Sequence, residues 1–160
     1  MKNVWQYIMI KFTDNKEDII RLWKEAFGDS KEDILYFTDH AVDAECLACY
    51  EKDDICSMLY LVDCCYRDEK GKYIYAACTA EKAKGNGYMT QLLRHTFNLG
   101  YRFICLIPAE DSLITYYENR GFQKHISIDE IQFEQTDPIK EYLLEGYQLT
   151  EPIALLYKGE

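Results

Sequence analysis

The chain has 160 residues, of which 48% are hydrophobic and 29% are charged, and its formal net charge is −10 at pH 7. These proportions are typical of one globular domain, residues 1–160, and exclude a disordered or fibrous protein. The acidic balance argues against a nucleic-acid partner, which would require a basic surface. It is compatible with solubility alone, or with the attraction of a cationic amine.

The sequence contains no candidate for a membrane span. Its longest apolar runs, such as SMLYLV at 57–62, are far shorter than the ~20 residues that a span requires. The start of the chain, MKNVWQYIMIKF, has Gln6 inside its apolar stretch and no small-residue cleavage site behind it, unlike a signal peptide. We therefore expect a cytoplasmic protein without a membrane partner, either a monomer or a homodimer.

Seven cysteines, an odd number, lie mostly inside apolar, strand-like runs. This pattern fits a reducing compartment, where a free cysteine behaves as a small buried hydrophobe. The alternative is a metal site formed by Cys46, Cys49, Cys64 and Cys65. If AECLACYEK is a strand, Cys46 and Cys49 point to opposite faces and their sulfurs diverge. We therefore predict no metal site.

The chain begins with a predicted strand and two helices. Residues 7–13 form the strand, and Asp14 or Asn15 caps a helix that ends at Gly28. Its apolar positions follow helical spacing: Ile19, Ile20, Trp23, Ala26 and Phe27. Ser30 with Asp33 resembles a capping box, which opens a second helix through Ala41.

Three β-rich runs follow, separated by the turn signals KDD and DEKGK. They are residues 44–52, 55–67 and 71–80, and they predict an antiparallel meander. A helix with Met89, Leu92, Leu93 and Phe97 on one face comes next and ends near Gly100.

Residues 102–109 are almost wholly apolar, as expected for a central strand that is buried on both faces. A right-handed strand, helix and strand unit makes the strands at 73–79 and 102–108 parallel. Residues 111–122 then predict a helix that is capped by Asp111 or Ser112 and stopped by Gly121.

The last elements are a strand at 125–133, a short helix from Asp137 and Pro138 through Leu144, and a strand at 152–158. No repeat or low-complexity linker divides the chain. The pattern predicts a single mixed α/β domain.

The stretch EKAKGNGYMTQLL, residues 81–93, joins a strand to a helix. Helix N-termini bind anions, glycines let a ligand approach the backbone, and Lys82 and Lys84 add positive charge. The alternative is a structural glycine turn. The stretch has neither the third glycine of a dinucleotide fingerprint nor the ending of an NTPase P-loop.

The next helix contains SLITYYENRGF, in which Tyr117 lies four residues before Gly121 and Phe122. By itself, Tyr117 can be a packing residue or a proton donor. Together with Lys82, Gly85 and Gly87 at the preceding turn, about thirty residues earlier, this pattern resembles the GNAT superfamily of acetyl-CoA-dependent N-acetyltransferases.

The resemblance implies a GNAT-like fold, with a mostly antiparallel central sheet, two splayed parallel strands and flanking helices. It implies transfer of an acetyl group from acetyl-CoA to a primary amine of a small molecule or peptide, by direct attack in a ternary complex. Tyr117 would protonate the departing thiolate. The residues implied in binding coenzyme A are Ala77, Cys78, Thr79, Lys82, Lys84, Gly85, Asn86, Gly87, Tyr88 and Ser112.

The sequence departs from the family pattern in three places. Lys82 stands where arginine or glutamine is usual, and Glu110 stands where many relatives carry an asparagine, so that Ser112 is the candidate substitute. The strand before the glycine loop also has no carboxylate to act as general base. Glu81 and His40 are weak candidates, and a water chain is the alternative.

The missing base keeps two rival hypotheses open. One is a non-catalytic acyl-CoA-binding or sensing domain. The other is a structural or interaction domain that has lost the ligand.

Overall fold

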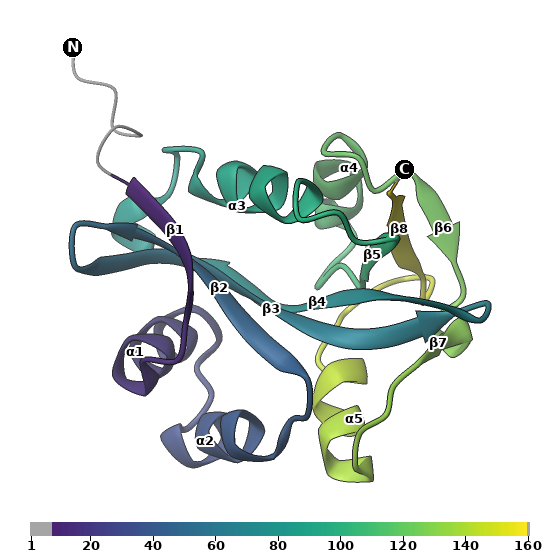
Figure 1. Cartoon of the computed structure of the whole chain (residues 1–160), viewed down its shortest axis with the longest axis horizontal. Helices are drawn as coiled ribbons and strands as arrows, with labels where there is room; N and C mark the ends of the chain where they lie inside the picture. The colour runs from purple at the N-terminus through teal and green to yellow at the C-terminus, as the bar shows by residue number, and fades with distance from the viewer. Residues whose placement is uncertain (1–7, 160) are drawn as a thin grey trace.

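The computed structural model describes residues 8–159, which form one eight-stranded sheet with helices on both faces (Figure 1). The strands are β1 (Ile8–Thr13), β2 (Ala44–Glu51), β3 (Asp54–Tyr66), β4 (Glu69–Thr79), β5 (Phe103–Leu106), β6 (Lys124–Ile126), β7 (Ile131–Gln132) and β8 (Ala154–Lys158). The helices are α1 (Lys16–Phe27), α2 (Lys31–His40), α3 (Tyr88–Phe97), α4 (Ser112–Glu118) and α5 (Asp137–Leu144), with short 3₁₀ helices η2 (Glu81–Ala83) and η3 (Ile128–Glu130).

The strand order is β1-β2-β3-β4-β5-β8-β6, and β7 pairs with β3 outside this path. All pairs are antiparallel except β4 with β5, which is parallel. This confirms the predicted mixed α/β fold with one parallel pair. Helices α1, α2 and α5 cover one face of the sheet, and α3 and α4 cover the other (Figure 1).

The first helices begin where the capping residues predict. The Asn15 side chain accepts a hydrogen bond of 3.1 Å from the Asp18 N–H, so Asn15 rather than Asp14 is the cap. The Ser30 hydroxyl accepts from the Asp33 N–H at 3.1 Å and opens α2. Tyr7, the first residue of the predicted strand 7–13, lies outside the described residues.

An aromatic cluster joins α1 and α2 to the sheet. Trp23 is 2% exposed, and its ring meets those of Phe37, Tyr60 and Tyr75 edge-on, with centroids 5.5 to 5.9 Å apart. Such edge-to-face pairs add to the stabilisation that comes from burial itself. The cluster therefore fixes α1 on the middle of β3 and β4.

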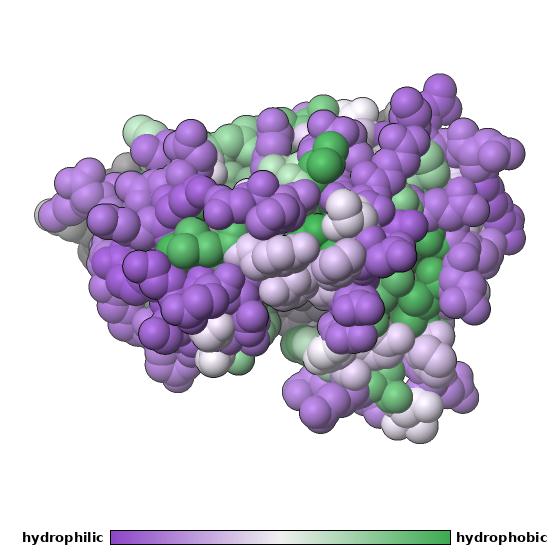
Figure 2. All heavy atoms as spheres, turned by 90° about the horizontal axis from the view of Figure 1, so that it is seen from below, coloured by the Kyte–Doolittle hydropathy of each residue, from purple (hydrophilic) through white to green (hydrophobic). Residues whose placement is uncertain are grey.

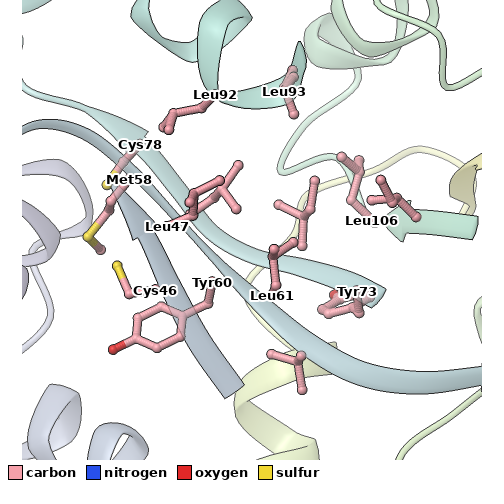
Figure 3. Packing of buried hydrophobic residues seen from close by; sticks show 14 of the residues in the cluster. Cys46, Leu47, Met58, Tyr60, Leu61, Tyr73, Cys78, Leu92, Leu93 and Leu106 are labelled. Atoms are coloured by element: carbon pink, nitrogen blue, oxygen red, sulfur yellow. The ribbon is translucent and has the colours of Figure 1, made fainter. Parts of the chain in front are cut away.

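The core continues on the other face of the sheet. Figure 3 shows Leu92 and Leu93 of α3 on the opposite side of the strands from Tyr60 and Cys46. Cys46 pairs with Tyr60 and Cys49 pairs with Ser57, three residues apart on each strand, so alternation places the two thiols on opposite faces of β2. Among the described residues, no group of three or more His, Cys, Asp or Glu side chains could hold a metal ion.

The predicted strand at 125–133 is wrong. The chain forms β6, the turn η3 and then β7, and the two strands pair with β8 and β3 respectively. The turn is closed by a hydrogen bond of 3.0 Å from the Glu130 N–H to the Ser127 carbonyl, while the Glu130 carboxylate accepts from the Ser127 N–H. These local bonds outweigh the alternating hydrophobic pattern.

Asp111 occupies the N-cap position of α4, as predicted, but its side chain makes no capping hydrogen bond. Its carboxylate instead accepts hydrogen bonds from the Thr150 N–H at 3.0 Å and from the Thr150 hydroxyl. The Ser112 hydroxyl donates to Glu110 at 2.6 Å. Asp111 therefore ties the segment before β8 to the start of α4.

The face that α1, α2 and α5 cover is mostly hydrophilic, and its hydrophobic side chains are exposed in separate places (Figure 2). Within residues 8–159, every helix is too short or too polar to traverse a lipid bilayer.

Candidate active site

The two parallel strands are held together at one end and separate at the other. β4 pairs with β5 only through Lys72 with Ile104 and Tyr73 with Cys105. A Cβ at Gly71 would come within 2.6 Å of the Phe103 ring and carbonyl, so only glycine allows this close approach. Beyond Tyr73, the edge of β4 that faces β5 has no strand partner in the described part of the chain.

A cavity of about 340 Å³ occupies the opening between these strands. Its lining includes Leu113 and Tyr117 of α4, which lies on one face of the sheet. From the other face come Trp23 and Phe27 of α1, Leu143 of α5, and the residues that follow each helix. The cavity thus connects the two faces of the sheet, and two ligands could approach one another from opposite sides.

A β-bulge shapes the wall of the cavity on β4. Tyr75 faces Tyr60 and Cys78 faces Met58, so that Ala76 and Ala77 together oppose one residue of β3. Ala76 has a φ of 55°, a left-handed conformation that is uncommon outside glycine. The bulge turns this part of β4 toward the cavity, where both alanines contribute to the lining.

Tyr117 is the predicted proton donor, and it lies in the cavity wall. The side chain is 9% exposed, and its ring packs edge-on against Phe122 at 5.8 Å. Its hydroxyl has no hydrogen-bond partner among residues 8–159. Burial raises the pKa of Tyr117 well above its usual value, so that the phenol keeps its proton at neutral pH.

The glycine loop ends at an uncapped helix. Gly87, with a φ of 77°, occupies the capping position of α3, where it has no side chain to bond the first turn. The first bond of the helix runs from the Gln91 N–H to the Gly87 carbonyl at 3.0 Å, so the amides before Gln91 have no partner within α3. Gly85, with a φ of 84°, has open space where a Cβ would stand. An anion can therefore approach the backbone here.

The two lysines of the loop do not present free charge. The Lys82 ammonium pairs with Asp54, which lowers the pKa of that carboxyl, and Lys84 pairs with Glu81 at 2.9 Å. All four side chains are largely exposed to solvent, so these pairs contribute little to stability. The backbone of the loop is thus its main feature for binding an anion.

Of the residues implied in binding coenzyme A, Ala77 alone lines the cavity. Cys78 is buried, and its carbonyl accepts from the Ser57 hydroxyl at 3.0 Å, while Thr79 shares a hydrogen bond with the same hydroxyl. The Tyr88 hydroxyl donates to Glu51 at 2.8 Å, so its side chain belongs to the core. Lys82, Lys84, Gly85, Asn86, Gly87, Tyr88, Cys78, Thr79 and Ser112 all lie outside the cavity lining.

Two acidic residues of the cavity were not predicted. Asp29, just after α1, and Glu145, just after α5, are the charged members of its described lining. The Asp29 carboxylate accepts a hydrogen bond of 2.8 Å from the indole N–H of Trp23. In the sequence, Asp29 follows a helix-ending glycine and Glu145 precedes another glycine, so both resemble ordinary turn residues.

The weak base candidates lie elsewhere. Glu81 faces Lys84, and His40 stacks on Tyr36 with a ring nitrogen 2.9 Å from the Tyr36 carbonyl. Neither residue lines the cavity.

Comparison with solved structures shows the same fold. A GNAT family acetyltransferase from Elizabethkingia anophelis with acetyl-CoA bound superposes with a TM-score of 0.64 at 19% identity, covering 95% of this chain and 98% of that one. The N-acetylglutamate synthase from Neisseria gonorrhoeae, complexed with coenzyme A and L-arginine, has a TM-score of 0.63 at 15% identity, covering 96% and 34%. A putative acetyltransferase from Pyrococcus horikoshii has a TM-score of 0.56 at 18% identity, covering 76% and 44%.

The chain thus spans about a third of the Neisseria protein and less than half of the Pyrococcus protein. No curated protein matches the sequence. The model of the acetyltransferase (GNAT) domain matches residues 11–124, which include the meander, the glycine loop and Tyr117. The chain belongs to the GNAT acetyltransferases.

Proposed function

We propose that the protein is an N-acetyltransferase that moves an acetyl group from acetyl-CoA to a primary amine of a small molecule or peptide. The observation that carries this proposal is the buried, unpartnered phenol of Tyr117 in a cavity that connects the two faces of the sheet. Donor and acceptor would enter from opposite faces and meet beside Tyr117. A ternary complex needs such an arrangement.

The residues on the donor side fit a coenzyme A thioester. The uncapped first turn of α3 and the open space at Gly85 suit a diphosphate. The unpaired edge of β4 beyond Tyr73 suits the amides of the pantetheine arm, because an extended amide chain can add to a free strand edge. Acetyl-CoA supplies the acetyl group as an activated thioester.

The residues of the cavity support direct transfer. In this reaction the amine nitrogen forms a bond to the acetyl carbonyl carbon, the carbon–sulfur bond breaks, and the nitrogen gives up a proton to water. The thiolate that leaves takes a proton from the Tyr117 hydroxyl, which recovers one from solvent, so the products are an amide and the free thiol. A positioned acid of this kind contributes roughly 10²–10⁴-fold to the rate.

Two measurements on one preparation test the proposal. Acetyl-CoA held at about 100 times its Kd should stabilise the protein by about 2.7 kcal/mol, measured as a rise in Tm. Free thiol should then appear from acetyl-CoA only when a primary amine is added. A Tm unchanged by acetyl-CoA and by coenzyme A would contradict binding of the donor.

The rival hypothesis of a non-catalytic acyl-CoA sensor predicts another result. The Tm would rise with acetyl-CoA, but no amine in a broad panel would release thiol. That outcome would overturn catalysis and leave donor binding intact.

A further inference from the structure

We propose that the amine acceptor carries a second positive charge in addition to the amine that is acetylated. Asp29 and Glu145 bind this acceptor. This inference rests on the proposed function, because it assigns a substrate class to the same cavity. A short aliphatic diamine represents the chemistry.

The acceptor side of the cavity is negatively charged. Asp29 and Glu145 are the charged residues in the described lining of the cavity, and no lysine, arginine or histidine accompanies them there. The Glu145 carboxylate has no hydrogen-bond or ion-pair partner among the described residues. Two carboxylates without a cation favour a positively charged ligand and oppose one that carries a carboxylate.

Asp29 is held at the cavity by a hydrogen bond from Trp23. One carboxylate oxygen accepts the indole N–H of Trp23, a side chain that is 2% exposed and packed against three aromatic rings. Asp29 is exposed at the edge of the cavity, and this bond holds one carboxylate oxygen there and leaves the second without a partner in residues 8–159. Burial raises the pKa of Tyr75, which also lines the cavity, and the negative charge of Asp29 adds to this shift.

The cavity has two carboxylates, one more than the reacting amine needs. The amine that reacts must lose its positive charge before it attacks the acetyl carbonyl. One carboxylate is enough to receive this group while it is still an ammonium. The second carboxylate is then available for a charge that the acceptor retains. Phe27, Tyr75 and Tyr147 also line the cavity, and aromatic rings favour ammonium groups over neutral ones.

The Tyr117 side chain is the independent observation. It is nine-tenths buried and lines the same cavity, and its hydroxyl has no partner among residues 8–159, so the hydroxyl is available to a group bound in the cavity. The acidic residues and the phenol lie on opposite faces of the sheet, on either side of the point where donor and acceptor would meet.

The experiment compares three acceptors with the same four-carbon chain: diaminobutane, butylamine and γ-aminobutyrate. Thiol release from acetyl-CoA gives kcat/KM for each, and calorimetry in the presence of coenzyme A gives the affinity for diaminobutane. We expect diaminobutane to exceed butylamine by about tenfold or more, as charge-assisted hydrogen bonds of this kind allow. γ-Aminobutyrate should be the poorest acceptor.

The variants Asp29→Asn and Glu145→Gln remove charge with little change of shape. The amide oxygen of asparagine can still accept from the Trp23 indole, so Asp29→Asn keeps that bond. Each variant should reduce the preference for diaminobutane over butylamine, and the double variant should bring it close to one. The KM for diaminobutane should rise with salt in the wild type and not in the double variant.

Glu32→Gln is the matched control, because Glu32 is an exposed carboxylate in the first turn of α2 and lies outside the cavity lining. It should leave the preference unchanged. A preference retained in the double variant, or a wild type that favours butylamine, would overturn the inference.

Failure of the proposed function gives a different result. Thiol release would then be absent with all three acceptors, and calorimetry alone decides the inference. Affinity for diaminobutane that is lost in the double variant supports it, whereas affinity that is absent or unchanged contradicts it.

Discussion

Tyr117 combines a place in the cavity wall with a hydroxyl that has no partner in the described chain. Among the other buried tyrosines, Tyr73 and Tyr88 bond to the Leu143 carbonyl and the Glu51 carboxylate. The Tyr66 hydroxyl is fully buried without a partner in residues 8–159 and lies outside the cavity lining, so a missing partner does not by itself indicate a ligand. The position of Tyr117 in the cavity is what allows its hydroxyl to meet one.

The Tyr117→Phe variant should lower kcat by about 10²-fold or more and change the Kd for acetyl-CoA by less than about threefold, because only the acid is lost. Its Tm should not fall, since the substitution removes a hydroxyl that has no partner in the described chain. Thiol-release assays and calorimetry give the two constants. A variant with full activity across the pH range would refute the acid role.

The pH profile provides a second test of the same residue. Because burial raises the pKa of Tyr117, the phenol stays protonated beyond pH ~10, where a free tyrosine ionises. The kcat of the wild type should therefore show no alkaline fall that depends on Tyr117 below that pH.

Single residues also mark the limit of prediction from the sequence. The sequence predicts Tyr117 as a site residue because it lies at a fixed distance from Gly121 and Phe122 within one helix and its turn. Asp29 and Glu145 come from turns that are far apart in the chain and meet only because α1 and α5 cover the same face of the sheet. No local pattern distinguishes them from the many other acidic turn residues.

At the scale of elements, α3 offers two glycines that make a matched pair. Gly85 precedes the helix with a φ of 84°, and Gly100 follows it with a φ of 85°. At both glycines, the position that a Cβ would occupy has no neighbouring atom within 4 Å. Alanine at either position should lower the free energy of unfolding by about 1 kcal/mol, because the left-handed conformation disfavours a side chain.

Only Gly85→Ala should weaken the binding of acetyl-CoA, by about tenfold, which equals about 1.4 kcal/mol. The added methyl group would fill the space through which a diphosphate reaches the backbone. Urea unfolding and calorimetry on both variants separate strain from ligand contact. Equal losses of affinity in the two variants would argue against a diphosphate at this loop.

The elements themselves were predictable where one local signal dominates. Asn15, Ser30 and Pro138 mark helix starts that the structure retains, and the β-rich runs at 44–52, 55–67 and 71–80 form β2, β3 and β4. The strand expected at 125–133 failed because its two halves pair with different, distant strands. Pairing partners are set by the whole sheet, and alternation does not encode them.

For the whole molecule, the buried thiols and phenols predict how stability depends on pH. Burial raises the pKa of Cys46 and of Cys49 to about 12, and raises those of Tyr60 and Tyr73 as well. The unfolded chain loses these protons at lower pH than the folded one. The stabilisation is therefore complete only below pH ~8, under the unfolded thiol pKa of ~8.5, and declines as the pH rises toward the folded-state values.

The free energy of unfolding should thus fall between about pH 8 and about pH 10, with Cys46 alone accounting for about 1 kcal/mol of the loss. Chemical unfolding at several pH values, with a reducing agent present, measures it. The Cys46→Ala variant starts less stable but should lose about 1 kcal/mol less over the same range. Parallel curves for the two proteins would rule out this contribution.

The short parallel pairing of β4 with β5 has a consequence for the sheet as a unit. Two residue pairs join a block of β1 to β4 with a block of β5, β8 and β6, and beyond them the ladder of backbone hydrogen bonds is interrupted. A molecule that forms backbone-type hydrogen bonds to the free edges of both β4 and β5 would join the two blocks into one continuous sheet. Its concentration would then regulate how cooperatively the protein unfolds, in addition to how fast it reacts.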